Sequence, residues 1–112
     1  AKSDIVQLLK KKAKSPTGQA TVTSTEWEAL EKQVRLQYPY FLSKLKSLCY
    51  HFRRDELRLC MLIKMGFGPS DIGMLMEHPV QTITTMRRRL AKNILQLPEI
   101  RPQDWDIFIH SL

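Results

Sequence analysis

The sequence predicts an all-α domain, a small bundle of helices. Apolar residues recur three and four positions apart along most of the chain, which is the spacing of one buried helical face. Glycine and proline breaks divide the chain into segments of helix length. No stretch shows convincing strand alternation, and the β-branched run 21–23 is too short to change this prediction.

The composition predicts one small domain with an anionic partner. The 112 residues leave room for one modest core, and the hydrophobic share of 43% is ordinary for a globular protein. The net charge of +7 favours nucleic acid or an anionic membrane surface as partner. No signal peptide or membrane span is visible, so we expect a cytoplasmic location. The chain begins with Ala1 rather than Met, which predicts a fragment of a larger regulator whose membrane anchor, if any, lies elsewhere.

Residues 1–24 are expected to form a basic leader and a linker. A short apolar stripe stands beside a run of lysines: Ile5, Leu8, Leu9, Lys10, Lys11, Lys12 and Lys14. This stretch fits the end of a longer helix, such as one in a coiled coil, or a basic arm that touches DNA. We favour a solvated, partly flexible leader, because termini with a short apolar stripe are often poorly ordered. Residues 15–20 have the composition of a linker.

Residues 25–112 are expected to form the folded domain, which opens with two helices. Ser24 or Thr25 caps the first helix, with acidic residues in its first turn. Its buried stripe is predicted to be Trp27, Leu30, Val34 and Tyr38. The second helix follows Pro39, with the apolar face Phe41, Leu42, Leu45, Leu48 and Cys49. These two helices carry no chemistry, and we expect them to widen the core or to hold a dimer contact.

Three further helices and two breaks follow. The first helix, from Asp55 to Met65, is nearly all apolar, and the break 66–69 ends it. Ser70 is the expected N-cap of a short second helix that ends at Met76. After the break 77–79, a third helix runs from about residue 80 to residue 94. Gly73 is expected where the second and third helices cross, and Pro79 suits the first turn of the third helix.

The third helix has two different faces. Its predicted buried face is Ile83, Met86, Leu90 and Ile94. Its predicted outer face is Gln81, Thr84, Thr85, Arg88 and Lys92, flanked by Arg87 and Arg89. No acid lies between Pro79 and Asn93. A short helix, a tight turn and a longer helix with a basic outer face predict a helix-turn-helix unit over about residues 70–94, whose second helix enters the DNA major groove.

This arrangement predicts two kinds of DNA contact. The residues expected at base edges are Gln81, Thr82, Thr84 and Thr85. The residues expected at phosphates are Ser70, Arg87, Arg88, Arg89 and Lys92. The alternative is an ordinary solvated helix face, but four basic residues within six positions without an acid favour DNA contact.

The chain is expected to end in one more helix, from Gln103 to about Ser111. Its apolar face is predicted to be Trp105, Phe108, Ile109 and Leu112. This face could form a homodimer contact, or it could fold back on Trp27 and complete the core. We favour the second arrangement for most of these residues.

Several spaced motifs resemble one known family. The segments 56–63, 70–73 and 81–84, together with Arg87, Arg89 and Leu90, are similar to the helix-turn-helix of the LuxR/GerE type. The whole region from residue 25 to residue 112 resembles the C-terminal DNA-binding domains of Bacteroides-type transcriptional regulators, which often carry tetratricopeptide repeats. The Trp-bearing helix, the segment 38–41 and the segment 104–112 contribute to this likeness. The resemblance implies transcription regulation in the cytoplasm.

The chain departs from this family at several positions. Arg53 and Arg54 stand where the family has a capping Ser or Thr, and Gly73 stands where it has Ala. Near Thr84 and Met86 the family frequently has a Lys and a His, Tyr or Arg, and this chain lacks them. The base contacts of the family therefore do not transfer directly, whereas the arginines expected at phosphates remain.

The sequence argues against an enzyme. It has no glycine-rich phosphate loop and no carboxylate cluster, and its three histidines have no zinc-site spacing with the cysteines. Cys49 or Cys60 with His51 is the best nucleophile pair available, but both cysteines stand in apolar runs that predict burial. We expect both to be small core residues rather than a disulfide. We expect no cofactor, metal or small-molecule substrate.

Two alternatives to DNA binding stay open. The same helices could dock to RNA polymerase or another regulator, and binding to duplex DNA at physiological salt would distinguish the two. The chain could also be a helical adaptor whose lysine run binds anionic lipid. This adaptor ranks last because its apolar stripe is short. Many regulators of the leading kind bind paired half-sites as homodimers.

Overall fold

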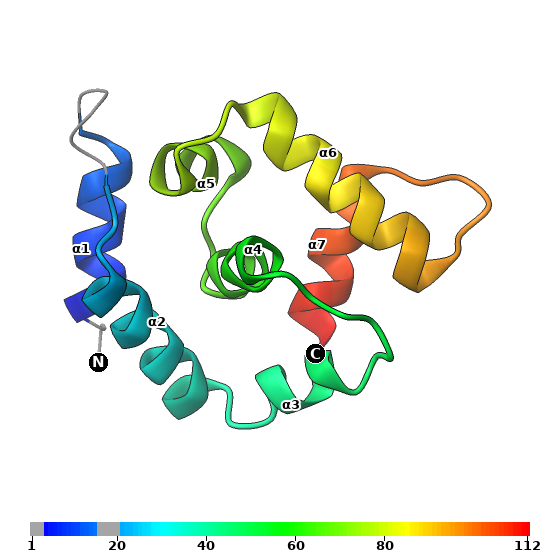
Figure 1. Cartoon of the computed structure of the whole chain (residues 1–112), viewed down its shortest axis with the longest axis horizontal. Helices are drawn as coiled ribbons and strands as arrows, with labels where there is room; N and C mark the ends of the chain where they lie inside the picture. The colour runs from blue at the N-terminus through cyan, green and yellow to red at the C-terminus, as the bar shows by residue number, and fades with distance from the viewer. Residues whose placement is uncertain (1–3, 16–20) are drawn as a thin grey trace.

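The computed structural model describes residues 4–15 and 21–112, and all regular structure within them is helical (Figure 1). This confirms the predicted all-α class. The predicted linker, residues 15–20, lies outside the described residues apart from Ser15. The helices are α1 (Asp4–Ala13), α2 (Ser24–Gln37), α3 (Phe41–Lys46), α4 (Arg54–Lys64), α5 (Pro69–Met76), α6 (Val80–Leu90), the π-helical turn η1 (Ala91–Leu95) and α7 (Pro102–Ser111).

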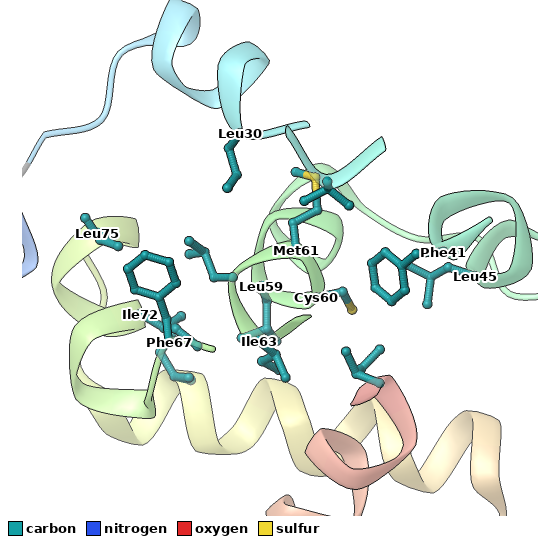
Figure 2. Packing of buried hydrophobic residues seen from close by; sticks show 14 of the residues in the cluster. Leu30, Phe41, Leu45, Leu59, Cys60, Met61, Ile63, Phe67, Ile72 and Leu75 are labelled. Carbon is teal, nitrogen blue, oxygen red and sulfur yellow. The ribbon is translucent and has the colours of Figure 1, made fainter. Parts of the chain in front are cut away.

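Helix α4 lies at the centre of the molecule, with α2, α5 and α7 packed against it (Figure 1). Its stretch from Leu59 to Ile63 is apolar on every side, as expected for a helix surrounded by others. The buried apolar side chains of α4 are Leu59, Cys60, Met61, Leu62 and Ile63. Figure 2 shows Leu59, Cys60, Met61 and Ile63 between Phe67, Ile72 and Leu75 on one side and Phe41 and Leu45 on the other. The core therefore holds α5 in place, and α5 in turn holds α6.

Helices α5 and α6 meet at Gly73, as the sequence predicts. A Cβ atom at this position would lie 2.8 Å from the carbonyl oxygen of His78, which is closer than real Cβ contacts. The backbone N–H of His78 donates to the carbonyl of Gly73 at 2.9 Å, and Glu77 adopts a left-handed conformation between the helices. Helix α6 follows Pro79, which is its N-cap residue rather than a member of its first turn.

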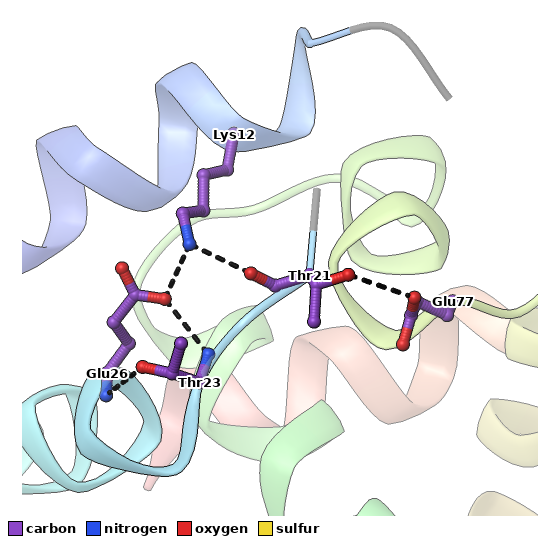
Figure 3. Close-up of polar contacts among 5 residues, drawn as sticks. All are labelled: Lys12, Thr21, Thr23, Glu26 and Glu77. Carbon is purple, nitrogen blue, oxygen red and sulfur yellow. Dashed lines mark hydrogen bonds and ion pairs between the residues drawn. The ribbon is translucent and has the colours of Figure 1, made fainter. Parts of the chain in front are cut away.

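The N-terminal residues correct one prediction, because residues 4–13 form a packed helix rather than a solvated leader. Leu9 is fully buried, and Val6 and Ala13 are buried beside it, where α1 contacts α2 and α5. The ammonium of Lys12 lies 2.6 Å from the carboxylate of Glu26 and donates to the backbone at 2.8 Å (Figure 3). The short apolar stripe is sufficient because these polar contacts reinforce it.

At two helices the N-cap residue differs from the predicted one. Thr23, rather than Ser24 or Thr25, caps α2, because its hydroxyl accepts from the N–H of Glu26 at 3.2 Å. The Glu26 carboxylate accepts in return from the N–H of Thr23 at 2.9 Å, which completes a capping box. Ser70 does not cap α5 either, since Pro69 already occupies the first helical position after Gly68.

The two cysteines differ, so the prediction that both belong to the core is half wrong. Cys60 is fully buried, and this burial raises the pKa of its thiol. Cys49 is exposed with a φ of 57°, because α3 ends at Lys46 and the chain turns away from the core. Neither cysteine forms a disulfide.

Helix α7 folds back on the same chain, but its partners are α4 and α6 rather than Trp27. Trp105 is fully buried, with its ring centroid 5.4 Å from that of Phe108. Trp27 is covered instead by the guanidinium of Arg58, 4.6 Å from its ring centroid. The buried ammonium of Lys64 donates to the carbonyl of His110 in the last turn of α7. Its positive charge stabilises the negative, C-terminal end of the helix dipole. Within residues 4–15 and 21–112, no helix is both long and apolar enough to cross a bilayer.

Candidate nucleic-acid interface

One continuous stripe of polar side chains follows the outer side of α6 and continues onto η1. Gln81, Thr85, Arg88 and Lys92 are all exposed, and they stand four, three and four positions apart. This spacing keeps them on one face of a helix. Ile83 and Leu90 are fully buried on the opposite face. Four of the five residues expected to face outward are therefore exposed, and no other part of the described chain covers these four.

The threonines of α6 differ in their positions. Thr85 lies on the outer stripe, whereas Thr82 and Thr84 are half-buried on its two flanks. The hydroxyl of Thr85 donates to the carbonyl of Gln81 at 3.0 Å, and that of Thr84 donates to the carbonyl of Val80 at 3.1 Å. A hydroxyl has one hydrogen, so each of these oxygens can only accept a further hydrogen bond while its backbone bond persists.

Arg87 has to be removed from the expected phosphate contacts. It is only 6% exposed, and its Nε and Nη2 atoms donate to the two carboxylate oxygens of Asp106 at 3.0 and 2.7 Å. Because the guanidinium is buried and one of its edges makes two hydrogen bonds to the Asp106 carboxylate, Arg87 has no role at a solvent-facing surface. Arg87 therefore joins α6 to α7. Sequence reasoning missed this because Asp106 is nineteen positions away.

Arg89 lies on the other flank of α6 and faces a groove. The groove has a volume of about 500 Å³, and its walls come from the start of α4, the turn before α6 and α6 itself. Arg53 and Arg54 form the α4 wall, and within the described residues neither they nor Arg89 makes an ion pair. The residues lining it are Arg53, Arg54, Asp55, Glu56, His78, Thr82, Met86 and Arg89.

The two carboxylates of this groove differ, because that of Glu56 is hydrogen-bonded within the fold, whereas that of Asp55 is exposed beside His78, which pairs with it only when protonated. The buried carboxylate of Glu56 accepts from the hydroxyl of Tyr50 at 2.9 Å and from the backbone N–H of Arg53 at 2.8 Å. Burial and this hydrogen bond to Glu56 raise the pKa of Tyr50. The Asp55 carboxylate lies 3.6 Å from Nε2 of His78. The three arginines are therefore the groups of this groove that remain available to an external anion.

Ser70 stands at the start of α5 and is exposed, as its role as an expected phosphate contact requires. Its neighbour Asp71 pairs at 3.0 Å with Lys14, which directly follows α1. Lys10 and Lys11 are exposed on the same helix and line a second groove of about 410 Å³ beside the α4–α5 turn. Basic side chains thus gather beside α5 as well as beside α6.

Sequence reasoning missed Arg53 and Arg54 as members of this surface. The signal was present, because two adjacent arginines stand at the start of a long helical pattern. They were interpreted only as an unusual helix cap. Without the fold, nothing brings them toward Arg89, more than thirty positions away.

The described residues show no constellation for other chemistry. No three His, Cys, Asp or Glu side chains lie close enough together to hold a metal ion within residues 4–15 and 21–112. The raised pKa of the buried Cys60 thiol makes a nucleophilic role for this residue unfavourable.

No family model, curated protein or solved structure matched the chain. The likeness to LuxR/GerE-type regulators thus stays a prediction from the residues quoted above.

Proposed function

We propose that this chain binds duplex DNA with sequence preference, as the output domain of a transcription regulator. One observation carries the proposal: the outer stripe of α6, formed by Gln81, Thr85, Arg88 and Lys92, is exposed, and α6 contains no acidic residue. The opposite face of α6 is anchored in the core. A rigid helix with a polar, cationic outer side is what a protein needs to read a major groove about 12 Å wide.

In this proposal α6 lies in the major groove and α5 supports it across the DNA backbone. The close contact at Gly73 fixes the angle between the two helices. The exposed Ser70 at the start of α5 would then face a phosphate of the same duplex, since helix starts favour anions. The proposal thus treats α5 and α6 as a helix-turn-helix unit, which is also what the LuxR/GerE resemblance implies.

Charge supplies the sequence-independent part of the affinity. Arg88, Arg89 and Lys92 are exposed on or beside the outer stripe. Each cation that neutralises a phosphate releases a condensed counterion, so three of them predict a slope of about −3 in a plot of log binding constant against log salt concentration. Additional contacts would make this slope steeper.

Gln81 and Thr85 supply the sequence-dependent part. A glutamine side chain can bond both polar atoms of an adenine edge, and the Thr85 oxygen is restricted to accepting, which suits an amino group of adenine or cytosine. Gln81→Ala and Thr85→Ala are therefore expected to change which sequences bind best. Their effect on the salt slope should be small, because neither residue carries charge.

The test is selection of bound sequences from a random duplex pool, followed by salt titration on the recovered site. We expect an enriched motif, a negative salt slope, and an altered motif for Gln81→Ala. Recovery of no motif together with a flat salt response would overturn the proposal. It would favour the alternative in which the same helices dock to RNA polymerase or another regulator.

A further inference from the structure

We infer that the groove between the start of α4 and the flank of α6 holds a backbone phosphodiester of the duplex that α6 reads. This inference rests on the proposed function and adds a second contact site to it. Its central residues are Arg53, Arg54 and Arg89, none of which belongs to the outer stripe. The groove, rather than α6 alone, would then fix how far the duplex can rotate about α6.

The first argument is convergence of charge from separate parts of the chain. Arg53 and Arg54 come from the start of α4, whereas Arg89 comes from the last turn of α6. Three guanidinium groups around one opening repel one another, and a phosphate that they share would remove this repulsion. Arginine is also the side chain whose planar fork matches phosphate oxygens.

The second argument concerns the acids that could neutralise these arginines. Glu56 is buried, and its carboxylate accepts hydrogen bonds from the hydroxyl of Tyr50 and from the backbone N–H of Arg53. These contacts within the fold occupy the carboxylate, so it does not pair with a groove arginine. Asp55 faces His78 across 3.6 Å. Within the described residues, neither carboxylate lies within ion-pair distance of a groove arginine. The three arginines therefore remain available to an anion from outside the described chain.

The third argument is continuity with the outer stripe, which favours a phosphodiester over a free anion. Arg89 follows Arg88 in the chain, and Thr82 follows Gln81, so the groove borders the stripe along α6. A duplex whose major groove receives α6 must place a strand on each side of that helix. The half-buried side chain of Met86 adds an apolar wall, which suits the carbon atoms of a deoxyribose.

The experiment replaces single phosphates with uncharged methylphosphonates on the recovered duplex, and combines them with Arg54→Gln and Arg89→Gln in the full chain. We expect each arginine variant to weaken binding about tenfold for all sequences. Each should also reduce the magnitude of the salt slope by about one. One methylphosphonate position should weaken the unaltered chain by a similar factor but leave the variants nearly unaffected, because the contact is already lost.

The matched control is Arg35→Gln, which removes the same charge from an exposed position on α2. It should bind within about twofold of the unaltered chain, since an exposed charge far from the duplex contributes little. Thermal unfolding of all variants should coincide, because each altered side chain is exposed.

The outcomes separate this inference from the proposed function. If the unaltered chain binds the duplex and the two groove variants bind equally well with the same salt slope, the groove inference is wrong and the proposed function stands. If the unaltered chain binds no duplex, both fail. Titration with inorganic phosphate at constant ionic strength tests whether the groove binds free phosphate instead of a backbone phosphodiester. Saturation of the groove by phosphate alone, with no methylphosphonate position that matters, would also overturn the inference.

Discussion

Arg87 and Arg89 stand two positions apart on α6, yet they face opposite environments. Arg87 is buried, and one edge of its guanidinium makes two hydrogen bonds to Asp106 of α7. Arg89 is exposed and faces a groove, and within the described residues no carboxylate forms an ion pair with it. Arg88 lies between them on the outer stripe. The three consecutive arginines therefore lie in three environments. Arg87 lies on the flank of α6 that α7 covers (the closed flank), Arg88 on the outer face, and Arg89 on the flank beside the groove (the open flank).

The difference shows that a run of like charges on a helix cannot act as one unit. Successive residues on a helix are separated by about 100°, so three of them point in three directions. The closed flank exists because α7 brings a carboxylate to it, and the open flank exists because α4 brings two further arginines. The neighbouring helices, rather than the residue type, decide whether each arginine stabilises the fold or remains available to a ligand.

The largest expected effect comes from the closed flank. Arg87→Gln should lower the free energy of unfolding by about 2–4 kcal/mol, because it leaves the Asp106 carboxylate without its partner beside the core. Arg88→Gln and Arg89→Gln should change it by less than about 0.5 kcal/mol. Urea unfolding followed by circular dichroism measures all three. Equal small effects in the three variants would show that the two flanks do not differ.

The second effect concerns the contact that orients α6. Gly73→Ala should destabilise the fold by about 1–3 kcal/mol, since its Cβ would lie 2.8 Å from the backbone oxygen of His78. The loss should exceed that of Gly68→Ala, where a Cβ meets nothing within 4 Å. Thermal unfolding of the pair measures the difference. An unchanged stability for Gly73→Ala would mean that the turn relaxes freely and does not fix the angle of α6.

The outer face gives the third effect, which appears in binding rather than in stability. Arg88→Gln should weaken binding to all duplexes about tenfold and reduce the magnitude of the salt slope by about one, while the fold stays intact. Any loss of binding in Arg87→Gln should instead track its fraction of unfolded protein. Binding isotherms at two salt concentrations, taken at a temperature where both variants are folded, separate the two cases. Equal, salt-dependent losses in both variants would contradict the assignment of Arg87 to the fold.

Most helices of this fold could be predicted because local patterns determine them. Gly73 was identifiable as the crossing point, since a glycine inside a short helical pattern allows a neighbouring backbone to approach closely. The outer stripe of α6 followed from helical spacing alone. The positions of the caps were less certain, because a row of adjacent serine and threonine residues offers several hydroxyls to one helix start.

What could not be predicted depends on pairs that are distant in sequence. Nothing local distinguishes Arg87 from Arg89, since the carboxylate that binds Arg87 arrives with α7. The same holds for α1, whose packing depends on Glu26 of α2 and Asp71 of α5. Arg53 and Arg54 belong to the groove only because α4 starts beside α6. The outer stripe of the candidate site could thus be predicted from the sequence, whereas the groove could not.

The smallest expected effect tests whether the same contrast recurs in the lysine run of α1. Lys12 is paired with Glu26, whereas Lys10 and Lys11 are exposed. The hydrogen bond from Lys12, followed by that from the backbone of Thr23, lowers the pKa of Glu26 below its ordinary value of 4.5. A carboxyl whose pKa is lower in the folded chain binds fewer protons there than in the unfolded chain. Its stabilising effect is therefore complete above about pH 4.5 and is lost as the pH falls through the folded pKa.

We accordingly expect the free energy of unfolding to fall in this acidic range, and to fall less in Glu26→Gln, whose side chain does not titrate. Lys12→Gln should reduce the pH dependence in the same way, because it removes the main cause of the shift. Lys11→Gln is the matched control and should leave the pH dependence unchanged. Urea unfolding between about pH 3 and pH 7 measures these differences. A Lys12→Gln curve parallel to that of the unaltered chain would show that Lys12 is solvated like its neighbours, and that α1 is held by Val6, Leu9 and Ala13 alone.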